Sequence, residues 1–448
     1  MLDFLLCSIP KSNVDNPLIG LPILKSILNK NDYTSKILDF NIELYHKFIN
    51  KEIFNEGDLN EWVDLDYMFR NKFPNSRYIE AYNKLLDEWV ERILDYNPKF
   101  VGFTIFSSHN AYSAMSLSKL IRKKSDTIKI VVGGPATIWF NFKKLRANNI
   151  IDYCVRGYGE ESILKILKGE SFVGVNDDEH CKQVDISQTP PPDFTDLDLT
   201  LYTDQKVLYT YSSRGCTQNC DFCDVHDIWG KYNTRKVDSV IKDMIHGIKT
   251  HEINRFEFCD SLINGNLNHM ESLCNGLKHY NFNWVGMFRI RKMKDSHYDL
   301  LKESGCILLK IGIESGNENV RKDMNKYFSN DQILSTINNL RRVGIKCALF
   351  FMTGYPSETN QNHEESKNLI KQFYDNGFGD TINQIRVAPL EIQNNNLELV
   401  KLKETGGQKY RYERYHDLRK HIQKFNFDIV GDDRMNIVVK GYEDKLKN

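Results

Sequence analysis

The segment RGCTQNCDFCDVH, residues 214–226, places three of the chain's ten cysteines within eight residues. They are Cys216, Cys220 and Cys223, in the spacing Cys-x3-Cys-x2-Cys. A closed structural zinc site uses four ligands, so this segment is one ligand short unless His226 supplies the fourth. Three thiolates on a cubane iron–sulfur cluster would instead leave one iron free to bind another molecule. The segment therefore predicts a metal centre with an open coordination position, with structural zinc as the alternative.

The composition is that of a globular protein with a sizeable core. The chain has 448 residues, of which 41% are hydrophobic and 27% charged. Its 60 basic residues balance its 60 acidic ones, so net charge gives no reason to expect nucleic acid or a membrane as partner. No apolar run reaches the roughly 18 residues that cross a bilayer, and the first residues lack the positive charge of a signal peptide. We therefore expect a cytoplasmic protein with reduced cysteines.

In the first half of the chain, short apolar runs alternate with helical patterns. The expected strands are residues 3–8, 35–40, 100–106 and 128–134, followed by a short fifth strand. Near-continuous apolar runs are typical of parallel strands buried on both faces, so residues 1–185 predict an α/β domain. Such sheets bind ligands at the carboxyl ends of their strands, where small residues gather: Ser107, Ser108, Gly133, Gly134, Gly157 and Gly159. Glycines there allow close approach to a bulky ligand, although turn geometry would explain each equally well.

Two segments interrupt this alternation. Residues 45 to about 97 are aromatic-rich and acidic, and they are too long for a plain connection, so we expect a helical insertion that packs on the domain or caps a site. Residues 186–205 include three consecutive prolines. Because proline disfavours a helix upstream, this segment predicts a surface linker and a domain boundary.

A second strand–helix series follows the linker. Its expected strands are residues 206–212, 255–258, 282–287, 307–313, 346–351 and 381–387. Six repeats are fewer than the eight of a closed barrel, so residues 206–391 predict a partial (β/α)6 barrel. Residues 392–448 predict a small helical or mixed segment that closes one side. The cysteine segment comes directly after the first strand, at the end where such folds place their chemistry.

This second series resembles the radical S-adenosylmethionine (SAM) superfamily. The resemblance rests on the cysteine spacing with Phe222 before the last cysteine, and on the segments FEFCDSLING, GIESG and GIKCALFFMTGYPSET. It implies that Cys216, Cys220 and Cys223 bind a [4Fe–4S] cluster and act in catalysis, with SAM on the open iron. It also implies contacts to SAM from Phe222, Asp260, Ser261, Arg289, Glu314, Ser315 and Gly354. From the residues alone, Arg289 could equally form a structural ion pair and Gly354 only a turn, whereas a carboxylate such as Glu314 inside a barrel is costly unless it is used.

Residues 1–185 resemble the Rossmann-like, flavodoxin-like cobalamin-binding domain that precedes many radical SAM enzymes. The segments that carry this resemblance are NPLIGLPIL, VGFTIFSSHN, VVGGP and YCVRGYGEESI. It implies that cobalamin binds at the serines and glycines of the strand ends named above. The family's Asp-x-His-x-x-Gly motif is absent, because the chain reads IPKSNVDNPLIG after its first strand. A bound cobalamin would therefore lack a histidine ligand from that loop.

The combined resemblance implies an anaerobic radical enzyme that methylates an unactivated carbon of a small molecule or peptide. Flavodoxin or ferredoxin would be the one-electron reductant. A rearranging or ring-forming enzyme without methyl transfer, a tRNA methylthiotransferase and a non-catalytic cobalamin or iron–sulfur sensor are the alternatives. The methylthiotransferase would need a second trio from Cys7, Cys154 and Cys181. The remaining single cysteines are expected to lie in the core as small hydrophobic residues: Cys259, Cys274, Cys306 and Cys347.

Overall fold

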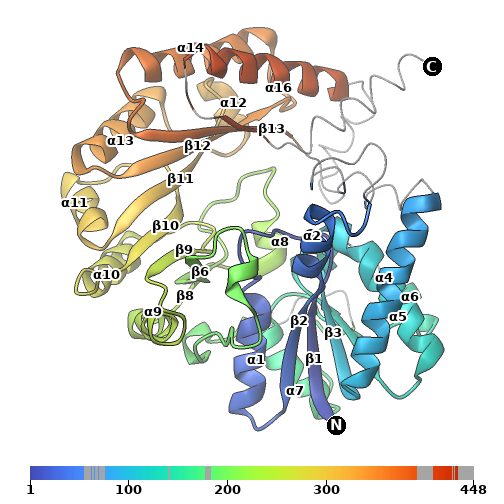
Figure 1. The fold of residues 1–448 in the computed structure, drawn as a ribbon. Helices are drawn as coiled ribbons and strands as arrows, with labels where there is room; N and C mark the ends of the chain where they lie inside the picture. The colour runs from blue at the N-terminus through green and yellow to red at the C-terminus, as the bar shows by residue number, and fades with distance from the viewer. Residues whose placement is uncertain are drawn as a thin grey trace. The chain divides into compact units, whose positions relative to one another are not determined.

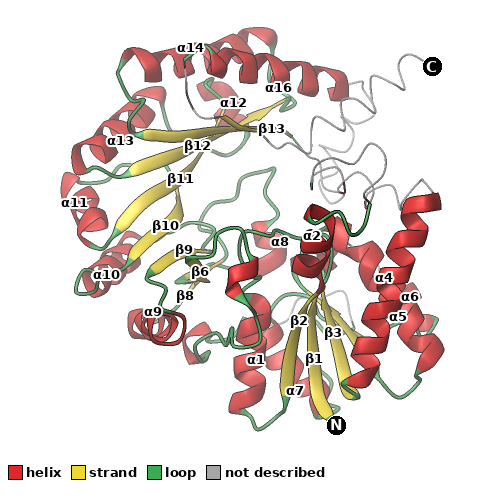
Figure 2. Ribbon diagram, viewed as in Figure 1, coloured by secondary structure: helices red, strands yellow, loops and turns green. Residues whose placement is uncertain are grey.

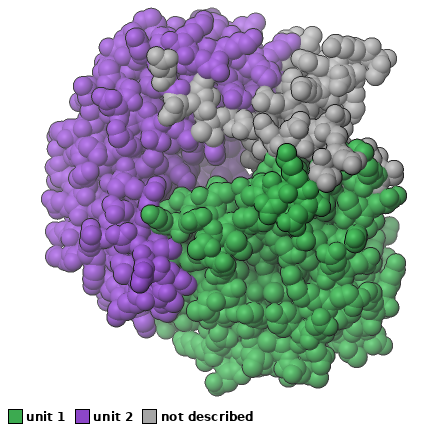
Figure 3. Space-filling model, viewed as in Figure 1, with its two compact units in different colours: residues 1–209, 227–230 green, residues 210–226, 231–448 purple. Residues whose placement is uncertain are grey.

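The structure, a computed structural model, describes residues 1–54, 62, 65, 69, 76–139, 142–176, 183–390, 407–425, 427 and 429–431. The chain divides into two compact units, residues 1–209 with 227–230, and residues 210–226 with 231–448 (Figure 3). The proline-rich linker thus belongs to the first unit. The chain also returns to that unit shortly after the cysteine segment, where Trp229 packs edge-on against Tyr158 at 5.7 Å between ring centroids. No helix among the described residues is long and apolar enough to cross a bilayer.

The first unit contains a five-stranded sheet (Figure 1). Its strands are β1 (Leu2–Ser8), β2 (Ser35–Asp39), β3 (Pro98–Thr104), β4 (Lys129–Gly133) and β5 (Tyr153–Cys154). They are parallel and follow the order β2-β1-β3-β4-β5. This is the flavodoxin-like order, so the predicted fold class is confirmed for this unit.

Helices cover this sheet. They are α1 (Gly20–Lys30), α2 (Phe40–Ile49), α4 (Ser76–Asp95), α5 (Ser108–Lys124), α6 (Lys143–Ala147) and α7 (Gly159–Leu167). Helix α4 lies within the expected insertion, and its fully buried Trp89 stacks on Phe40 at 4.8 Å. Much of residues 55–75 of that insertion lies outside the described residues. The described part of the insertion therefore joins the hydrophobic core of the domain.

The second sheet has seven strands in the order β14-β13-β12-β11-β10-β9-β6, of which β6 spans the boundary between the two units and the others belong to the second unit. Its strands are β6 (Val207–Thr210), β9 (Arg255–Phe258), β10 (Asn283–Phe288), β11 (Cys306–Glu314), β12 (Lys346–Thr353), β13 (Ile382–Pro389) and β14 (Ile429–Gly431). From β9 to β14 each strand pairs in parallel with its neighbour. Strands β6 and β14 are the two edges of this sheet, as an open barrel requires. The seventh strand, β14, was not predicted.

Helices cover one side of this second sheet (Figure 2). They are α9 (Val237–His251), α10 (Leu267–Leu277), α11 (Asp295–Glu303), α13 (Asn330–Val343), α14 (Asn360–Asp375) and α16 (Gly407–Gln423). On β11, Leu309, Ile311 and Ile313 are fully buried on this side, whereas Lys310 and Gly312 alternate with them and point the other way. We call the side without these helices the inner face.

The linker of the first unit is held by buried ion pairs. Lys25 of α1 lies 3.3 Å from Asp193 and 2.7 Å from Asp196, and Lys36 of β2 lies 2.8 Å from Asp196. The backbone N–H of Ile37 also donates to Asp196 at 2.9 Å. Burial alone would raise the pKa of Asp196, but the hydrogen bonds from the two lysines outweigh it and hold that pKa below its ordinary value. The charged carboxylate therefore stabilises the docked linker.

We predict that Asp196→Asn lowers the free energy of unfolding by about 3 kcal/mol at pH 7, because Lys25 and Lys36 lose the carboxylate that they share and Lys25 keeps only Asp193. A carboxylate with a lowered pKa contributes fully above the ordinary carboxyl pKa of about 4 and loses that contribution as the pH falls through its folded value. The deficit should therefore shrink at pH 3, as measured by urea denaturation. Asp126→Asn, at an exposed position, is the control and should change little. An equal deficit at both pH values would contradict a role for the charge.

Candidate active site

The cysteine segment forms a loop that is closed at its base by a small ribbon. Strand β7 (Ser213–Arg214) pairs antiparallel with β8 (Asn233–Thr234). Gly215, directly before Cys216, has a φ of +79°, and a Cβ there would lie 2.9 Å from the carbonyl oxygen of Lys231. Only glycine fits this conformation and this close approach without strain. The ribbon and the glycine together set the direction in which the loop leaves the sheet.

Asp260, just beyond the end of β9, holds the root of this loop. It is 1% exposed and accepts hydrogen bonds from the Ser212 N–H at 2.7 Å, the Ser212 hydroxyl at 2.7 Å and the Ser213 hydroxyl at 2.5 Å. Burial raises the pKa of Asp260, and these hydrogen bonds oppose the rise. Both carboxylate oxygens have partners, so Asp260 positions the loop. Its neighbour Ser261, also predicted to contact SAM, is partly exposed.

The three thiols lie close enough to affect one another. Cys216 and Cys220 are half-buried, and the Gln218 N–H donates to the Cys216 sulfur at 3.4 Å. Partial removal of its sulfur from water, together with the neighbouring thiols of Cys220 and Cys216, raises the pKa of Cys223 to about 11. A bound iron would deprotonate such thiols outright. The donor set therefore has the chemistry of a three-thiolate iron–sulfur site.

The loop does not provide a fourth ligand for zinc. The Nε2 atom of His226 lies 2.6 Å from the carbonyl oxygen of Gln218 and is occupied by that hydrogen bond. Across the described part of the chain, no three His, Cys, Asp or Glu side chains are grouped tightly enough to hold a single ion. In a cubane each thiolate binds a different iron, so such tight grouping is not needed. The geometry favours the cluster over zinc.

Two cations lie beside Cys220. Burial lowers the pKa of Arg289, while Cys220 and Cys216 raise it, the first also through a hydrogen bond. Lys326 likewise favours the thiolate of Cys220, and its ammonium lies 5.8 Å from the ring centre of Phe222. Positive charge near Cys220 stabilises the negative charge that three thiolates bring to a cluster. Of these residues the sequence analysis missed Lys326, which no local motif marks.

The GIESG segment is built around an ion pair. Lys326 lies 2.6 Å from Glu314 Oε1 and donates to the Gly312 carbonyl at 3.0 Å. A Cβ on Gly312 would lie 2.3 Å from that carboxylate oxygen and 2.7 Å from the ammonium. The register of β11 with β12 shifts between Gly312 and Glu314, and Glu314 has a φ of +68°. This bulge re-aims the carboxylate, as bulges beside active sites do.

The two residues that complete this segment fix the following loop. The hydroxyl of the buried Ser315 accepts from the Asn317 N–H at 3.1 Å. The N–H of Gly316 donates to the Ser366 hydroxyl of α14 at 2.8 Å, and a Cβ on Gly316 would lie 2.4 Å from the Ser366 Cα. The second glycine of the segment is therefore explained by packing against α14.

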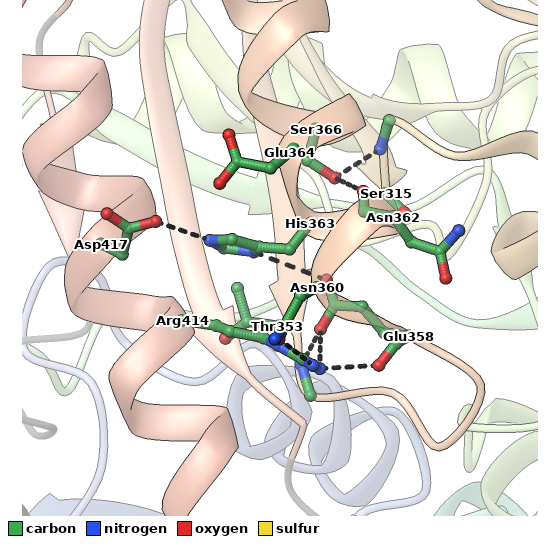
Figure 4. Close-up of polar contacts among 12 residues, drawn as sticks. Ser315, Thr353, Glu358, Asn360, Asn362, His363, Glu364, Ser366, Arg414 and Asp417 are labelled. Atoms are coloured by element: carbon green, nitrogen blue, oxygen red, sulfur yellow. Dashed lines mark hydrogen bonds and ion pairs between the residues drawn. The ribbon is translucent and has the colours of Figure 1, made fainter.

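Gly354, predicted to border the nucleoside of SAM, begins a turn that contacts a network of polar side chains. The network includes Glu358, His363, Arg414 and Asp417 (Figure 4). The Gly354 N–H donates to Glu358 at 2.6 Å, and Arg414 of α16 lies 3.2 Å from the same carboxylate. His363 of α14 lies 3.8 Å from Glu358 and 3.0 Å from Asp417 of α16. These contacts tie α16 to α14 and to the end of β12.

The backbone of Gly354 also packs directly on α16. Its φ is +77°, and a Cβ there would lie 1.8 Å from the Arg411 Cγ. The guanidinium of Arg411 donates to the Leu390 carbonyl, and the Thr353 hydroxyl donates to the Arg411 carbonyl at 3.1 Å. Packing against Arg411 therefore accounts for the glycine, whatever its relation to a ligand.

In the first unit, the loops after β1 and β3 meet at the carboxyl edge of the sheet, where flavodoxin-like folds bind ligands. Asn110, which the sequence analysis did not single out, donates to the carbonyls of Ile9 at 2.7 Å and Lys11 at 3.1 Å. It also accepts from the Ser107 N–H at 2.8 Å. Ser108, the first residue of α5, is exposed. One asparagine thus ties together the two loops that would border a ligand.

The glycines at the same edge have different reasons to be there. Gly134 has a φ of +109°, and a Cβ there would lie 2.8 Å from the Ile105 carbonyl oxygen. Gly157 has a φ of +88°, and a Cβ on Gly159 would lie 3.2 Å from Leu24 of α1. Gly133 is not crowded, since its nearest neighbour would be 3.7 Å away. Small, exposed and positive-φ residues at these ends are compatible with a bulky ligand, and their local packing also explains Gly134 and Gly159.

Among the described residues, the other cysteines do not form a second site. Cys7 on β1 and Cys154 on β5 are buried on strands that are not neighbours, and Cys181 lies outside the described residues. Cys274, Cys306 and Cys347 are buried, as predicted. The prediction was wrong for Cys259, which is exposed. Cys259 directly follows β9, and alternate residues of that strand face away from the helices, as Cys259 does.

Comparison with known proteins matches both parts of the chain. Residues 210–370 match the Radical SAM superfamily, and residues 64–167 match the B12 binding domain. An uncharacterized methyltransferase of Pyrococcus horikoshii is 23% identical over 301 residues, which are 62% of this chain and 65% of that protein. The chain thus covers slightly less than two thirds of the length of this relative.

Two solved structures share the fold over most of the chain. The radical SAM methyltransferase TsrM from Kitasatospora setae, solved with cobalamin and a [4Fe–4S] cluster, has a TM-score of 0.65 at 14% identity, covering 90% of this chain and 78% of TsrM. The cobalamin-dependent radical SAM enzyme OxsB, solved with aqua-cobalamin, has a TM-score of 0.63 at 14% identity, covering 92% of this chain and 56% of OxsB. The order of the two domains is therefore that of known two-domain folds.

We predict that Gly354→Ala destabilises the second unit by more than about 2 kcal/mol, because alanine disfavours the left-handed conformation and its Cβ collides with Arg411. The shift of the urea midpoint measures this effect. Gly379→Ala is the matched control, since a Cβ at that position would meet nothing within 4 Å. Equal midpoints for the two variants would show that α16 does not pack against Gly354.

Proposed function

Because the chain combines a B12-binding domain with a radical SAM domain, we propose that it is a cobalamin-dependent radical SAM methyltransferase. The observation that supports this most is the three-thiol loop at the carboxyl end of the second sheet, with Arg289 and Lys326 beside Cys220. The substrate is a small molecule or a peptide, and the reaction is methylation of an unactivated carbon. Flavodoxin or ferredoxin supplies the electron.

In this proposal Cys216, Cys220 and Cys223 each hold one iron of a [4Fe–4S] cluster. When bound, the cluster and SAM supply a 5′-deoxyadenosyl radical, and cobalamin supplies the methyl group. The protein contributes placement and charge. Arg289 and Lys326 offset the negative charge of the thiolates, and the loop root holds the three sulfurs at the strand end.

The same proposal assigns the contacts to SAM. Phe222 and Ser261 border the methionine part, and Glu314 and Ser315 lie toward the nucleoside, with Gly354 beside the adenine. Glu314 keeps one carboxylate oxygen on Lys326, so its other oxygen is the one offered to SAM. Asp260 lies with Ser261 on the methionine side of SAM in this proposal, and it also holds the loop root through Ser212 and Ser213.

Cobalamin binds at the carboxyl edge of the first sheet in this proposal. The residues that border it are those of the strand ends: Ser107, Ser108, Gly133, Gly134, Gly157 and Gly159. In the loop after β1, the spacing Asp-x-His-x-x-Gly falls on Asp15, Pro17 and Gly20, so proline stands where the motif has histidine. The carbonyls of Ile9 and Lys11 in this loop are already bound by Asn110. The cobalt therefore receives no imidazole from this loop.

We predict that Cys220→Ala abolishes the broad cluster absorbance near 400 nm and the formation of 5′-deoxyadenosine after anaerobic reconstitution with SAM and dithionite. The reason is that two thiolates cannot hold the cubane in an enzyme of this type. Cys347→Ala, which removes a buried thiol from β12, should keep both signals. A wild-type protein that binds iron but forms no 5′-deoxyadenosine would identify a sensor, and an unchanged yield in Cys220→Ala would refute the proposal.

We predict that the protein purified anaerobically with a supply of hydroxocobalamin retains a corrinoid, identified by mass spectrometry of the extracted cofactors. Gly157→Leu should reduce the retained amount at least tenfold, since a branched side chain disfavours positive φ and would block the strand end. Gly169→Leu, at another positive-φ glycine with nothing within 4 Å of its Cβ position, controls for backbone strain. Equal corrinoid in both variants would move the binding site away from this edge.

A further inference from the structure

The inner face of the second sheet is accessible and charged. On β9, β11 and β13 the residues of this face alternate with fully buried ones. They include Glu257, Lys310 and Arg386, none of which is buried. A charged side chain on the face of a parallel sheet is usually paired with an opposite charge or used to bind a ligand, because burying an unpaired charge is costly.

Two other cations near this face, Lys310 and Lys326, have acidic partners, and Arg386 has none among the described residues. Lys310 lies 2.5 Å from Glu257, across the intervening strand β10, and Lys326 lies 2.6 Å from Glu314. The side chain of Arg386 is exposed and makes neither an ion pair nor a hydrogen bond with any described residue. The guanidinium of Arg386 makes a cation–π contact with Phe350, whose ring centre lies 5.8 Å from the guanidinium carbon.

That contact orients the guanidinium. Phe350 and Arg386 are directly paired between β12 and β13, so their side chains leave the same face side by side. A guanidinium that lies over an aromatic ring can still donate hydrogen bonds, because its N–H groups point outward in its own plane. A planar fork of donors matches the two oxygens of a carboxylate or a phosphate.

The position of Arg386 leads toward the cysteine loop. Phe350 is paired on its other side with Gly312, so Arg386 and Gly312 lie in one row, two strands or about 10 Å apart. The carbonyl of Gly312 accepts a hydrogen bond from Lys326, which is paired with Glu314. Met352, the next residue of β12 on this face, belongs with Phe222 to one apolar cluster. A small molecule with its anionic group on Arg386 would thus be long enough to reach the cysteine loop.

We propose that Arg386 binds an anionic group of the substrate, a carboxylate or a phosphate, and so anchors that molecule on the inner face. This inference rests on the proposed function, because it assigns the anchor to the substrate of the radical chemistry. The remainder of the substrate then lies over Phe350 and Met352, toward Phe222. The substrate is accordingly a small anionic molecule, or a peptide that presents a carboxylate.

The test uses the full reconstituted chain and three probes: phenyl phosphate, benzoate and the neutral benzamide. Ligand-observed NMR titration should give binding of at least one anion and not of benzamide. Arg386→Gln should weaken the anion at least tenfold, and Arg386→Lys should weaken it less, because charge remains without the fork. Arg255→Gln is the matched control, since it removes an exposed arginine at the amino end of β9. The tighter of the two anions identifies the phosphate or the carboxylate class.

Equal anion binding by wild type and Arg386→Gln would overturn the proposal, as would wild type that binds neither anion or binds benzamide equally well. Thermal midpoints of the variants verify their folding, and Arg386→Lys keeps the test valid should Arg386→Gln unfold. Substrate-free formation of 5′-deoxyadenosine is measured separately, on the wild type and on the control variant Arg255→Gln. Its absence in all samples would refute the proposed function, while the titrations would still decide the role of Arg386.

Discussion

The buried carboxylate of Asp260 is the constraint on which the cysteine loop depends. A carboxylate removed from water is costly unless donors replace the lost hydration. Here Ser212 and Ser213 provide three donors, all at the point where the chain leaves β6. Because these donors are a backbone N–H and two hydroxyls, they fix both the backbone and the side chains at the loop root. The ribbon and Gly215 then determine where the three thiols emerge.

The negative charges of the loop are offset by cations that lie near them. Three thiolates bring negative charge to a cluster, and Glu314 adds to it. Arg289 and Lys326 oppose this charge from the same side, and Lys326 does so while bonded to Glu314. The absence of a side chain at Gly312 is what leaves room for that pair. One glycine in a strand thereby allows a carboxylate and an ammonium to share the space above the sheet.

Local patterns predicted the two sheets, and long-range contacts determined most of the site. Parallel strands buried on both faces read as apolar runs, and the cysteine spacing is contained in eight residues, so both are visible in the sequence. Lys326 has no such mark, because its role comes from folding back onto Glu314. Asp260 was expected to meet SAM, yet its partners lie 48 and 47 residues earlier. Strand β14 adds to β13 at the end of the alternating run FNFDI, residues 425–429, which the sequence analysis did not take as a strand.

Exposure of Arg386 would not by itself indicate a binding site, because a guanidinium in water costs little. Its position carries the inference. A surface arginine on a helix can move among many rotamers, whereas Arg386 leaves the middle of a strand with neighbours on both sides and lies over the ring paired with it. The nearby lysine of this face already has its carboxylate. An anion that arrives on this face therefore finds in Arg386 a cation whose donors have no partner among the described residues, and that cation sets where the rest of the molecule lies.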